Sequence, residues 1–195
     1  MTETQKPLQS TTIILHKPSA GEMLAFFTQG IIVSVPLTYF LETAAAGWVA
    51  SLGLGVWGYV ALVTVLAPFI EEFTKVFPLT FRHAETPRSI IRLGFLSGFG
   101  FGMAEFLLYI LVLGAPVAIR LPEMFFHGAS TAIAAYGVAS SRFGRFYLLA
   151  VFLHFSNNFL TFFGDIWFIF GTAVIAVCYV LAYRYYVISP DTYLE

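Results

Sequence analysis

Ionisable side chains recur inside apolar stretches of this sequence, and they are of the types that hydrolytic enzymes use. Glu71, Glu72 and Lys75 occur within five residues, and His127 and His154 lie in later stretches. Carboxylates and imidazoles can take a proton from water, and imidazoles can also donate hydrogen bonds or ligate a metal. A charged side chain at the centre of a membrane-spanning helix costs about 2.5 to 3.5 kcal/mol, so three unpaired glutamates would cost roughly 10 kcal/mol. Such side chains must therefore be paired with one another or serve a function.

The first cluster consists of two adjacent carboxylates and one ammonium group. In a helix Lys75 lies beside Glu71 and Glu72, because it follows them by four and three positions. One ammonium cannot neutralise both carboxylates, so one of them is left able to accept a proton from water. An alternative interpretation is a structural ion pair at the membrane edge, with the lysine reaching the lipid headgroups. That alternative accounts for Lys75 but not for the second glutamate.

A stripe of glycines precedes the next glutamate. Gly94, Gly98 and Gly102 recur every four residues, and Phe101 and Glu105 lie close to the same side of a helix. Small residues at this spacing let helix backbones approach each other. We therefore expect Glu105 to point into a helix bundle rather than toward lipid.

Two later stretches each carry polar side chains on one face. The first face holds Glu123, His127, Ser130 and Thr131, and the second holds His154, Asn158 and Thr161, with Asn157 at its edge. If these faces converge with the glutamates, bases, hydrogen-bond donors and candidate metal ligands meet in one site. No serine or cysteine nucleophile has an evident partner. Taken singly, each histidine is more typical of an interhelical hydrogen bond.

Other polar residues receive structural interpretations. We expect Gln29 and Asn157 to make interhelical contacts, and Glu42, Glu123 and Asp165 to be solvated at helix ends. The positions of the helices place Glu71 and Glu72 nearer one membrane face than Glu105 and His154. The site is therefore expected to be spread in depth unless Pro68 bends its helix.

The composition is that of a membrane protein. The 195 residues are 58% hydrophobic and 11% charged, whereas soluble domains are about a quarter charged. A formal charge of −1 gives no argument for a nucleic-acid partner, and the single cysteine, Cys178, excludes an internal disulfide. The length suits one helical bundle rather than two domains.

The elements that must position these residues are helices of membrane-spanning length. About 20 apolar residues cross the hydrocarbon layer, and the pattern predicts an all-α bundle of about six transmembrane helices. The expected helices cover residues 23–46, 48–81, 91–113, 121–140, 146–163 and 166–186. Residues 21–188 thus form a single transmembrane domain between an N-terminal tail (1–20), which we expect to be cytosolic, and a C-terminal tail (189–195).

The distribution of basic residues predicts the orientation. Basic side chains near helix ends are retained in the cytoplasm. With both termini cytoplasmic, eight basic residues lie inside and only Arg120 lies outside; the eight are Lys6, Lys17, Arg82, Arg88, Arg92, Arg142, Arg145 and Arg184. We therefore expect a multi-pass protein of the cell membrane, in contact with its lipids.

The polar motifs, taken in order, resemble those of the PrsW family of intramembrane proteases. Glu71-Glu72-Phe73-Thr74-Lys75 is similar to the family's EExxK motif, Phe101-Gly102-Met103-Ala104-Glu105 to FxxxE, His127 to a single-histidine motif and His154-Phe155-Ser156-Asn157-Asn158 to HxxxN. The motifs cover residues 68–158. Type II CAAX prenyl proteases and the wider CPBP group are similar in pattern but typically show EExxxR and FxxxH, so Lys75 and Glu105 favour the PrsW branch.

The resemblance implies a glutamic-type intramembrane endopeptidase. It implies that Glu71 and Glu72 include the base that activates water, that His154 and Asn158 stabilise the oxyanion, and that His127 orients or shares the proton. Lys75, Phe101 and Glu105 are implied in support, with Glu105 completing a proton network or holding water. No cofactor is expected, because the relatives look metal-independent, although the carboxylates and histidines could also bind a metal. Implied substrates are membrane-anchored proteins such as anti-sigma-like regulators.

Two other classes of function remain open at this point. A proton- or metal-coupled carrier could use the same carboxylates and imidazoles as a relay or ligand set. An inactive scaffold could bind transmembrane helices through the same groove. Metal content and flux in proteoliposomes would distinguish the carrier, and cleavage of a single-span substrate would distinguish the protease.

Overall fold

Helices form all the secondary structure in the part of the chain that the computed structural model describes, namely residues 17–81, 86–164 and 166–191. The predicted all-α bundle is confirmed. In chain order the elements are α1 (Ala20–Gln29), η1 (Gly30–Ser34), α2 (Val35–Ser51), α3 (Val56–Ala61), η2 (Leu62–Leu66), α4 (Ala67–Val76), η3 (Phe77–Phe81), α5 (Pro87–Leu111), α6 (Val117–Ala139), α7 (Phe143–Leu160), η4 (Thr161–Phe163) and α8 (Ile166–Ile188). Elements η1 and η2 are π-helical, and η3 and η4 are 3-10 helices.

Four helices in the described part of the chain are long and apolar enough to cross a membrane. They are Ala20–Ser51, Pro87–Leu111, Phe143–Phe163 and Ile169–Ile188. The stretch from α3 to η3 and helix α6 fall outside this set, and they carry the charged residues Glu71, Lys75 and Arg120 among others. The apolar helices therefore pack against two more polar segments.

The predicted helix boundaries are wrong at the turn between the first two helices and at the start of α6. The first helix continues to Ser51 and the next begins at Val56, because Gly47 stays helical while Gly53 and Gly55 turn the chain at φ values of +65° and +55°. These φ values favour glycine, which has no Cβ. Helix α6 begins at Val117 rather than near residue 121, so Pro122 lies inside the helix.

The glycine stripe of α5 lies against α6, as predicted. A Cβ atom at Gly94 would overlap the Cβ of Ala135, and one at Gly98 would overlap the carbonyl oxygen of His127. Glycine is required at these positions because the two backbones are in contact. The stripe thus brings the residues that follow it on α5 close to His127.

A π-helical turn precedes the glutamates of α4. Pro68 lies in the first turn of α4 and has no N–H to donate to the carbonyl of Thr64 four residues earlier. The chain winds as a π-helix over Leu62–Leu66, immediately before the turn that contains this proline. The wider winding changes the direction in which the following residues, Glu71 and Glu72, project.

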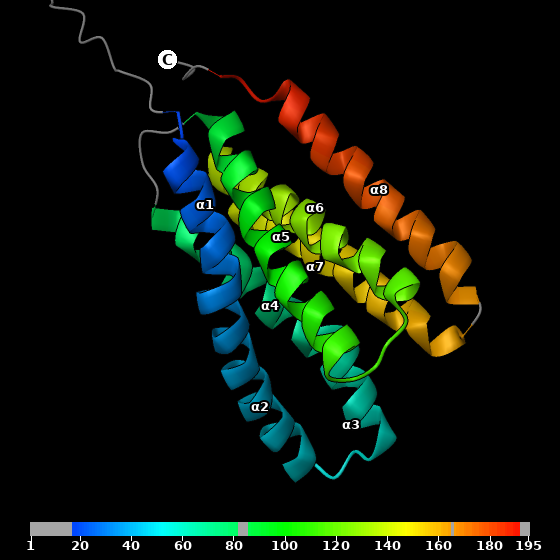
Figure 1. Ribbon diagram of the computed structural model, residues 1–195. Helices are drawn as coiled ribbons and strands as arrows, with labels where there is room; N and C mark the ends of the chain where they lie inside the picture. The colour runs from blue at the N-terminus through cyan, green and yellow to red at the C-terminus, as the bar shows by residue number, and fades with distance from the viewer. Residues whose placement is uncertain (1–16, 82–85, 165, 192–195) are drawn as a thin grey trace, which may run out of the picture.

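The two ends of the bundle differ in the segments that they bring together. Figure 1 shows the start of α1, the start of α5 and the end of α8 at one end, with the turn between α2 and α3 at the other. At the first end Asp191 lies 3.4 Å from Arg88 Nη1 and 3.9 Å from Lys17 Nζ. Lys6, Arg82 and Asp165, whose positions were predicted from the sequence, lie outside the described residues.

Candidate active site

The ion cluster of α4 is enclosed within the bundle. Lys75 Nζ lies 2.8 Å from Glu72 Oε1 and 3.7 Å from Glu71 Oε2, so the lysine faces both carboxylates as predicted. The side chains of Glu72 and Lys75 are 0% exposed. The alternative of a headgroup-wetted pair at the membrane edge is therefore excluded. The ring of Phe101 lies beside the lysine, with its centroid 4.8 Å from Nζ.

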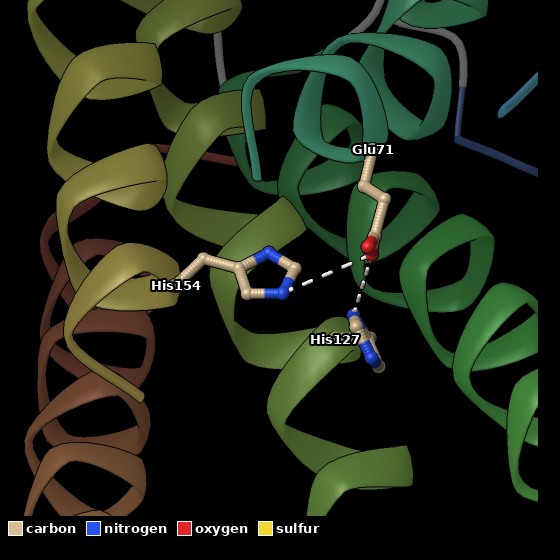
Figure 2. Close-up of side chains that lie close together, drawn as sticks. All are labelled: Glu71, His127 and His154. Carbon is tan, nitrogen blue, oxygen red and sulfur yellow. Dashed lines mark ion pairs between the residues drawn. The ribbon is translucent and has the colours of Figure 1, made fainter. Parts of the chain in front are cut away.

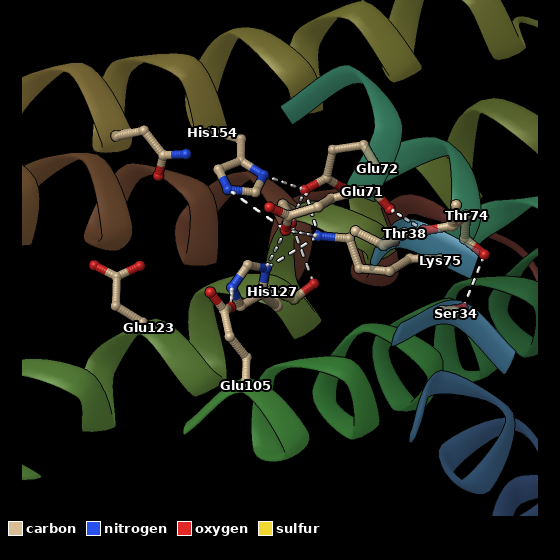
Figure 3. A network of polar contacts seen from close by, with 12 residues as sticks. Ser34, Thr38, Glu71, Glu72, Thr74, Lys75, Glu105, Glu123, His127 and His154 are labelled. Carbon is tan, nitrogen blue, oxygen red and sulfur yellow. Dashed lines mark hydrogen bonds and ion pairs between the residues drawn. The ribbon is translucent and has the colours of Figure 1, made fainter. Parts of the chain in front are cut away.

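Glu72 joins three helices through one carboxylate oxygen. Besides Lys75, its Oε1 is contacted by His154 Nδ1 on α7 at 2.9 Å and by Ser130 Oγ on α6 at 2.9 Å (Figure 3). Because a carboxylate only accepts hydrogen bonds, His154 carries a proton on Nδ1. The other ring nitrogen of His154, Nε2, then presents a lone pair.

Glu71 faces both histidines (Figure 2). Its Oε2 lies 3.8 Å from His127 Nδ1 and 3.8 Å from His154 Nε2. This oxygen is buried and has no hydrogen-bond partner among the described residues. A buried acceptor without a hydrogen bond, at a point where two imidazoles meet, suggests a place for water or another small group.

Glu105 extends the cluster to a third carboxylate. Its Oε2 lies 2.6 Å from His127 Nε2, so the prediction that Glu105 points into the bundle is confirmed. The site is not spread in depth, which is the outcome expected if the helix changes course at Pro68. The close approach of α5 to α6 brings Glu105 to His127, and Glu71 projects from α4 into the same cluster after the π-helical turn η2.

Arg120, which the distribution of basic residues placed on the outer side of the membrane and to which no role in the site was assigned, is a residue of the site. Its Nη2 lies 3.2 Å from Glu105 Oε1, and its guanidinium carbon lies 3.7 Å from the centroid of the Tyr109 ring. The predicted start of α6 at residue 121 left Arg120 in a loop. With the helix beginning at Val117, Arg120 shares a face with His127 seven residues later, and this spacing could have identified it.

Glu123 and Asn157 form a buried polar pair beside the histidines. Asn157 Nδ2 donates to Glu123 Oε2 at 2.8 Å, which links α7 to α6. The expectation that Glu123 is solvated is therefore wrong, whereas the interhelical contact predicted for Asn157 is confirmed. The predicted interhelical contact of Gln29 is also confirmed, since Gln29 Oε1 accepts a hydrogen bond from Ser97 Oγ at 2.8 Å.

Asn158 and Glu42 lie at the margin of the cluster. Asn158 Nδ2 donates to the carbonyl oxygen of Val63, in the π-helical turn, at 3.1 Å. Glu42 reaches the site from α2, and its Oε1 is buried without a hydrogen-bond partner, so solvation at a helix end is the wrong interpretation for this residue too. Both residues contribute to the wall of the cavity described next.

A polar cavity of about 280 Å³ connects these groups. Glu71, His127 and His154 line it together with Glu105 and Arg120, and further wall residues come from α2, η2 and η4. The polar faces of the separate helices thus converge on one chamber, as the sequence indicated. A volume of this size holds several water molecules, since each occupies about 30 Å³ in the liquid.

Three of these side chains have the types and spacing of a metal-ligand set. One donor atom each from Glu71, His127 and His154 lies within 4.8 Å of the other two. Each histidine also faces a second carboxylate through its other nitrogen, a common arrangement around zinc. The spacing is wide for bonds of about 2.0 to 2.2 Å to zinc.

The position of Lys75 opposes a metal ion at this triangle. Its ammonium lies 3.0 Å from His127 Nδ1, one of the three donor atoms, and 3.7 Å from Glu71 Oε2. A divalent cation at the same atoms would meet this positive charge at close range. The donor types fit a metal, but the arrangement fits one only if Lys75 moves away.

Comparison with known proteins gives a match to a protein family. Residues 18–185 match the family described as PrsW family intramembrane metalloprotease. No curated protein and no solved structure shows a significant match. The matched range includes every residue of the chamber named above.

Proposed function

Since the chain belongs to the PrsW family of intramembrane proteases and is a multi-pass membrane protein, we propose that it hydrolyses a peptide bond of a membrane-anchored protein with water activated by Glu71. The observation that carries this proposal concerns Oε2 of Glu71. This oxygen makes no hydrogen bond among the described residues, and it is buried 3.8 Å from a ring nitrogen of each histidine. A water molecule just out of the plane of these three atoms is within hydrogen-bond reach of all of them.

The hydrogen-bond partners of the two histidines determine which group can accept a proton from that water. Glu72 holds the proton of His154 on Nδ1, which leaves Nε2 as an acceptor toward the water. Lys75 donates to His127 Nδ1, so this nitrogen is already occupied. Glu71 is our proposed general base because its buried Oε2 makes no hydrogen bond among the described residues, and His154 Nε2 is the proposed second acceptor. Glu72 is a positioning residue because its Oε1 already contacts three donors.

The reaction that we propose has three steps. The water oxygen bonds to the carbonyl carbon of the substrate as its proton moves to Glu71. Glu71 passes this proton to Nε2 of His154, 3.8 Å away, which donates it first as a hydrogen bond to the oxyanion and then to the amide nitrogen as the C–N bond breaks. The proton of the new carboxylic acid moves to the amine, so a carboxylate and an ammonium leave. Asn158 has one N–H left after its bond to Val63 and can donate it to the oxyanion.

The chamber lies toward one end of the bundle. Tyr109 near the end of α5, Arg120 near the start of α6 and Thr161 after α7 contribute to its walls. With the predicted orientation these helix ends face away from the cytoplasm. We propose that substrates are cut toward the outer side, and that they include membrane-anchored regulators of the anti-sigma type, as the motif resemblance implies.

Metal-assisted hydrolysis is a second candidate, favoured by the donor set and by the family description. Glu71, His127 and His154 would hold the ion, which would supply Lewis-acid activation of water when bound. In that case Lys75 would have to leave the donor triangle. Metal content separates the two candidates, because the first needs no ion.

Cleavage in proteoliposomes tests the proposed function. The purified chain is reconstituted with a single-span substrate that carries a fluorophore on its outer segment, and the fragments are resolved on a gel. We expect cut fragments with the wild type and none with His154→Ala, provided that the variant remains folded by circular dichroism. Undiminished cutting by folded His154→Ala would contradict the proposed site, and a proton flux without cutting would favour the carrier.

A further inference from the structure

A second cavity lies between α5 and α8, apart from the polar chamber. Its volume is about 390 Å³, and its walls include Phe95 and Leu96 of α5, Ala132 of α6, and Tyr179 and Ala182 of α8. Among the described residues that line it, Arg92 alone has a charged side chain, so the groove suits a hydrocarbon chain.

The charged end of this groove is built around Arg92. Nε and Nη2 of Arg92 donate to the hydroxyl of Tyr186 at 3.0 and 2.6 Å, which fixes an exposed guanidinium at the end of the apolar walls. Arg88 and Lys17 lie at the same end of the bundle and share the single carboxylate of Asp191. Arg92, Arg88 and Lys17 are positive and Asp191 is negative, so these four groups have an excess of two positive charges, which is complementary to an anion.

The length of the groove matches part of one membrane leaflet. Tyr179 and Tyr186 are seven positions apart on α8, which corresponds to about 10 Å along the helix. One leaflet contributes about 15 Å of hydrocarbon. A chain that begins beside Arg92 can therefore follow α8 through most of the leaflet. Tyrosines are also common at the level of the headgroups.

We propose that this groove binds an anionic phospholipid, whose phosphate lies beside Arg92 and whose acyl chain fills the space between α5 and α8. Basic pockets between transmembrane helices on the cytoplasmic side bind such headgroups. The predicted orientation places Arg88 and Arg92 on that side. The lipid completes the packing of α8 against α5, and its binding is independent of the protease chemistry.

Native mass spectrometry of the intact chain in detergent tests the proposal without an activity assay. The protein is titrated with dioleoyl phosphatidylglycerol or, at equal concentrations, with dioleoyl phosphatidylcholine. We expect the wild type to retain the anionic lipid preferentially. Arg92→Gln should reduce that preference about fivefold, the effect expected for one basic residue near an anionic membrane surface.

Three controls separate the site from general lipid contact. Arg145→Gln removes an exposed arginine that lies 5.7 Å from the centroid of the Phe146 ring, outside the groove, and should keep the preference. Leu96→Trp fills the groove without changing the charge and should reduce retention of phosphatidylglycerol. Inorganic phosphate at roughly 100 times the lipid concentration should not displace the bound phosphatidylglycerol.

Each of several results would overturn the proposal. These are equal retention of the two lipids by the wild type, equal losses in Arg92→Gln and Arg145→Gln, full retention by Leu96→Trp, or displacement by inorganic phosphate. The last result would mean that Arg92, Arg88 and Lys17 bind a free anion rather than a lipid headgroup. Thermal unfolding of each variant in detergent, compared with the wild type, ensures that a loss of retention is not a loss of fold.

Discussion

The ammonium of Lys75 lies 2.8 Å from the Glu72 carboxylate, and neither side chain is exposed. This pair is the centre of a network that reaches α6 through Ser130 and α7 through His154. Buried charges are tolerated only when each has a partner. The pair therefore positions the helices that carry the chemistry, while Oε2 of Glu71, 3.7 Å from the same ammonium, makes no hydrogen bond among the described residues.

Lys75→Met should destabilise the protein because it leaves the buried charge of Glu72 without its cation. Breaking a buried pair from one side costs about 3 to 5 kcal/mol. Unfolding by SDS titration in mixed micelles, followed by circular dichroism, measures the change. The double variant Glu72→Gln/Lys75→Met should recover part of the loss. An unfolding midpoint equal to that of the wild type in Lys75→Met would contradict the role of the pair.

The approach of α5 to α6 should be sensitive to a single methyl group. Gly98→Ala would place a Cβ against the carbonyl of His127, and overpacking of this kind costs about 1 to 3 kcal/mol. It should also move His127 away from Glu105 and reduce cleavage. Gly144→Ala, at a position with open space around it, is the matched control and should be neutral or slightly stabilising. Equal behaviour of the two variants would contradict this description of the packing.

Arg120→Gln should slow cleavage without unfolding the protein. The guanidinium lies 3.2 Å from Glu105, which in turn faces His127, so its loss should let Glu105 move. We expect kcat to fall about tenfold, equivalent to about 1.4 kcal/mol, with little change in KM. Arg120→Lys should restore part of the rate, and Arg142→Gln, an exposed residue outside the chamber, serves as control. A rise in KM alone would assign Arg120 to substrate binding instead.

Metal content should distinguish the two forms of the mechanism. The Lys75 ammonium lies beside two of the three donor atoms, His127 Nδ1 and Glu71 Oε2. We therefore expect the purified wild type to hold far less than one zinc per chain by elemental analysis and to keep its activity in 1,10-phenanthroline. Lys75→Met should retain more zinc, since the repulsion is removed. One zinc per wild-type chain, lost in His154→Ala, would instead support the metal-assisted form.

The convergence of the site could be predicted from the sequence because the polar residues recur at helical spacing. The glycine stripe also predicted which side of α5 meets its neighbour. Arg120 and Glu123 were misplaced because the predicted helix, 121–140, begins four residues later than α6, which begins at Val117 and contains Pro122. Neither the π-helical turn before Pro68 nor the depth at which Glu71 meets Glu105 leaves a periodic signal in the sequence.

The most direct test of the central claim is the single-turnover rate of Glu71→Gln on a membrane-anchored substrate in proteoliposomes. The amide keeps the size of the side chain but cannot take the proton of water. We expect the rate to fall by a factor of 100 or more, roughly the contribution of a general base, while Glu22→Gln at the start of α1 keeps the wild-type rate. A folded Glu71→Gln protein that cuts as fast as the Glu22→Gln control would contradict the account.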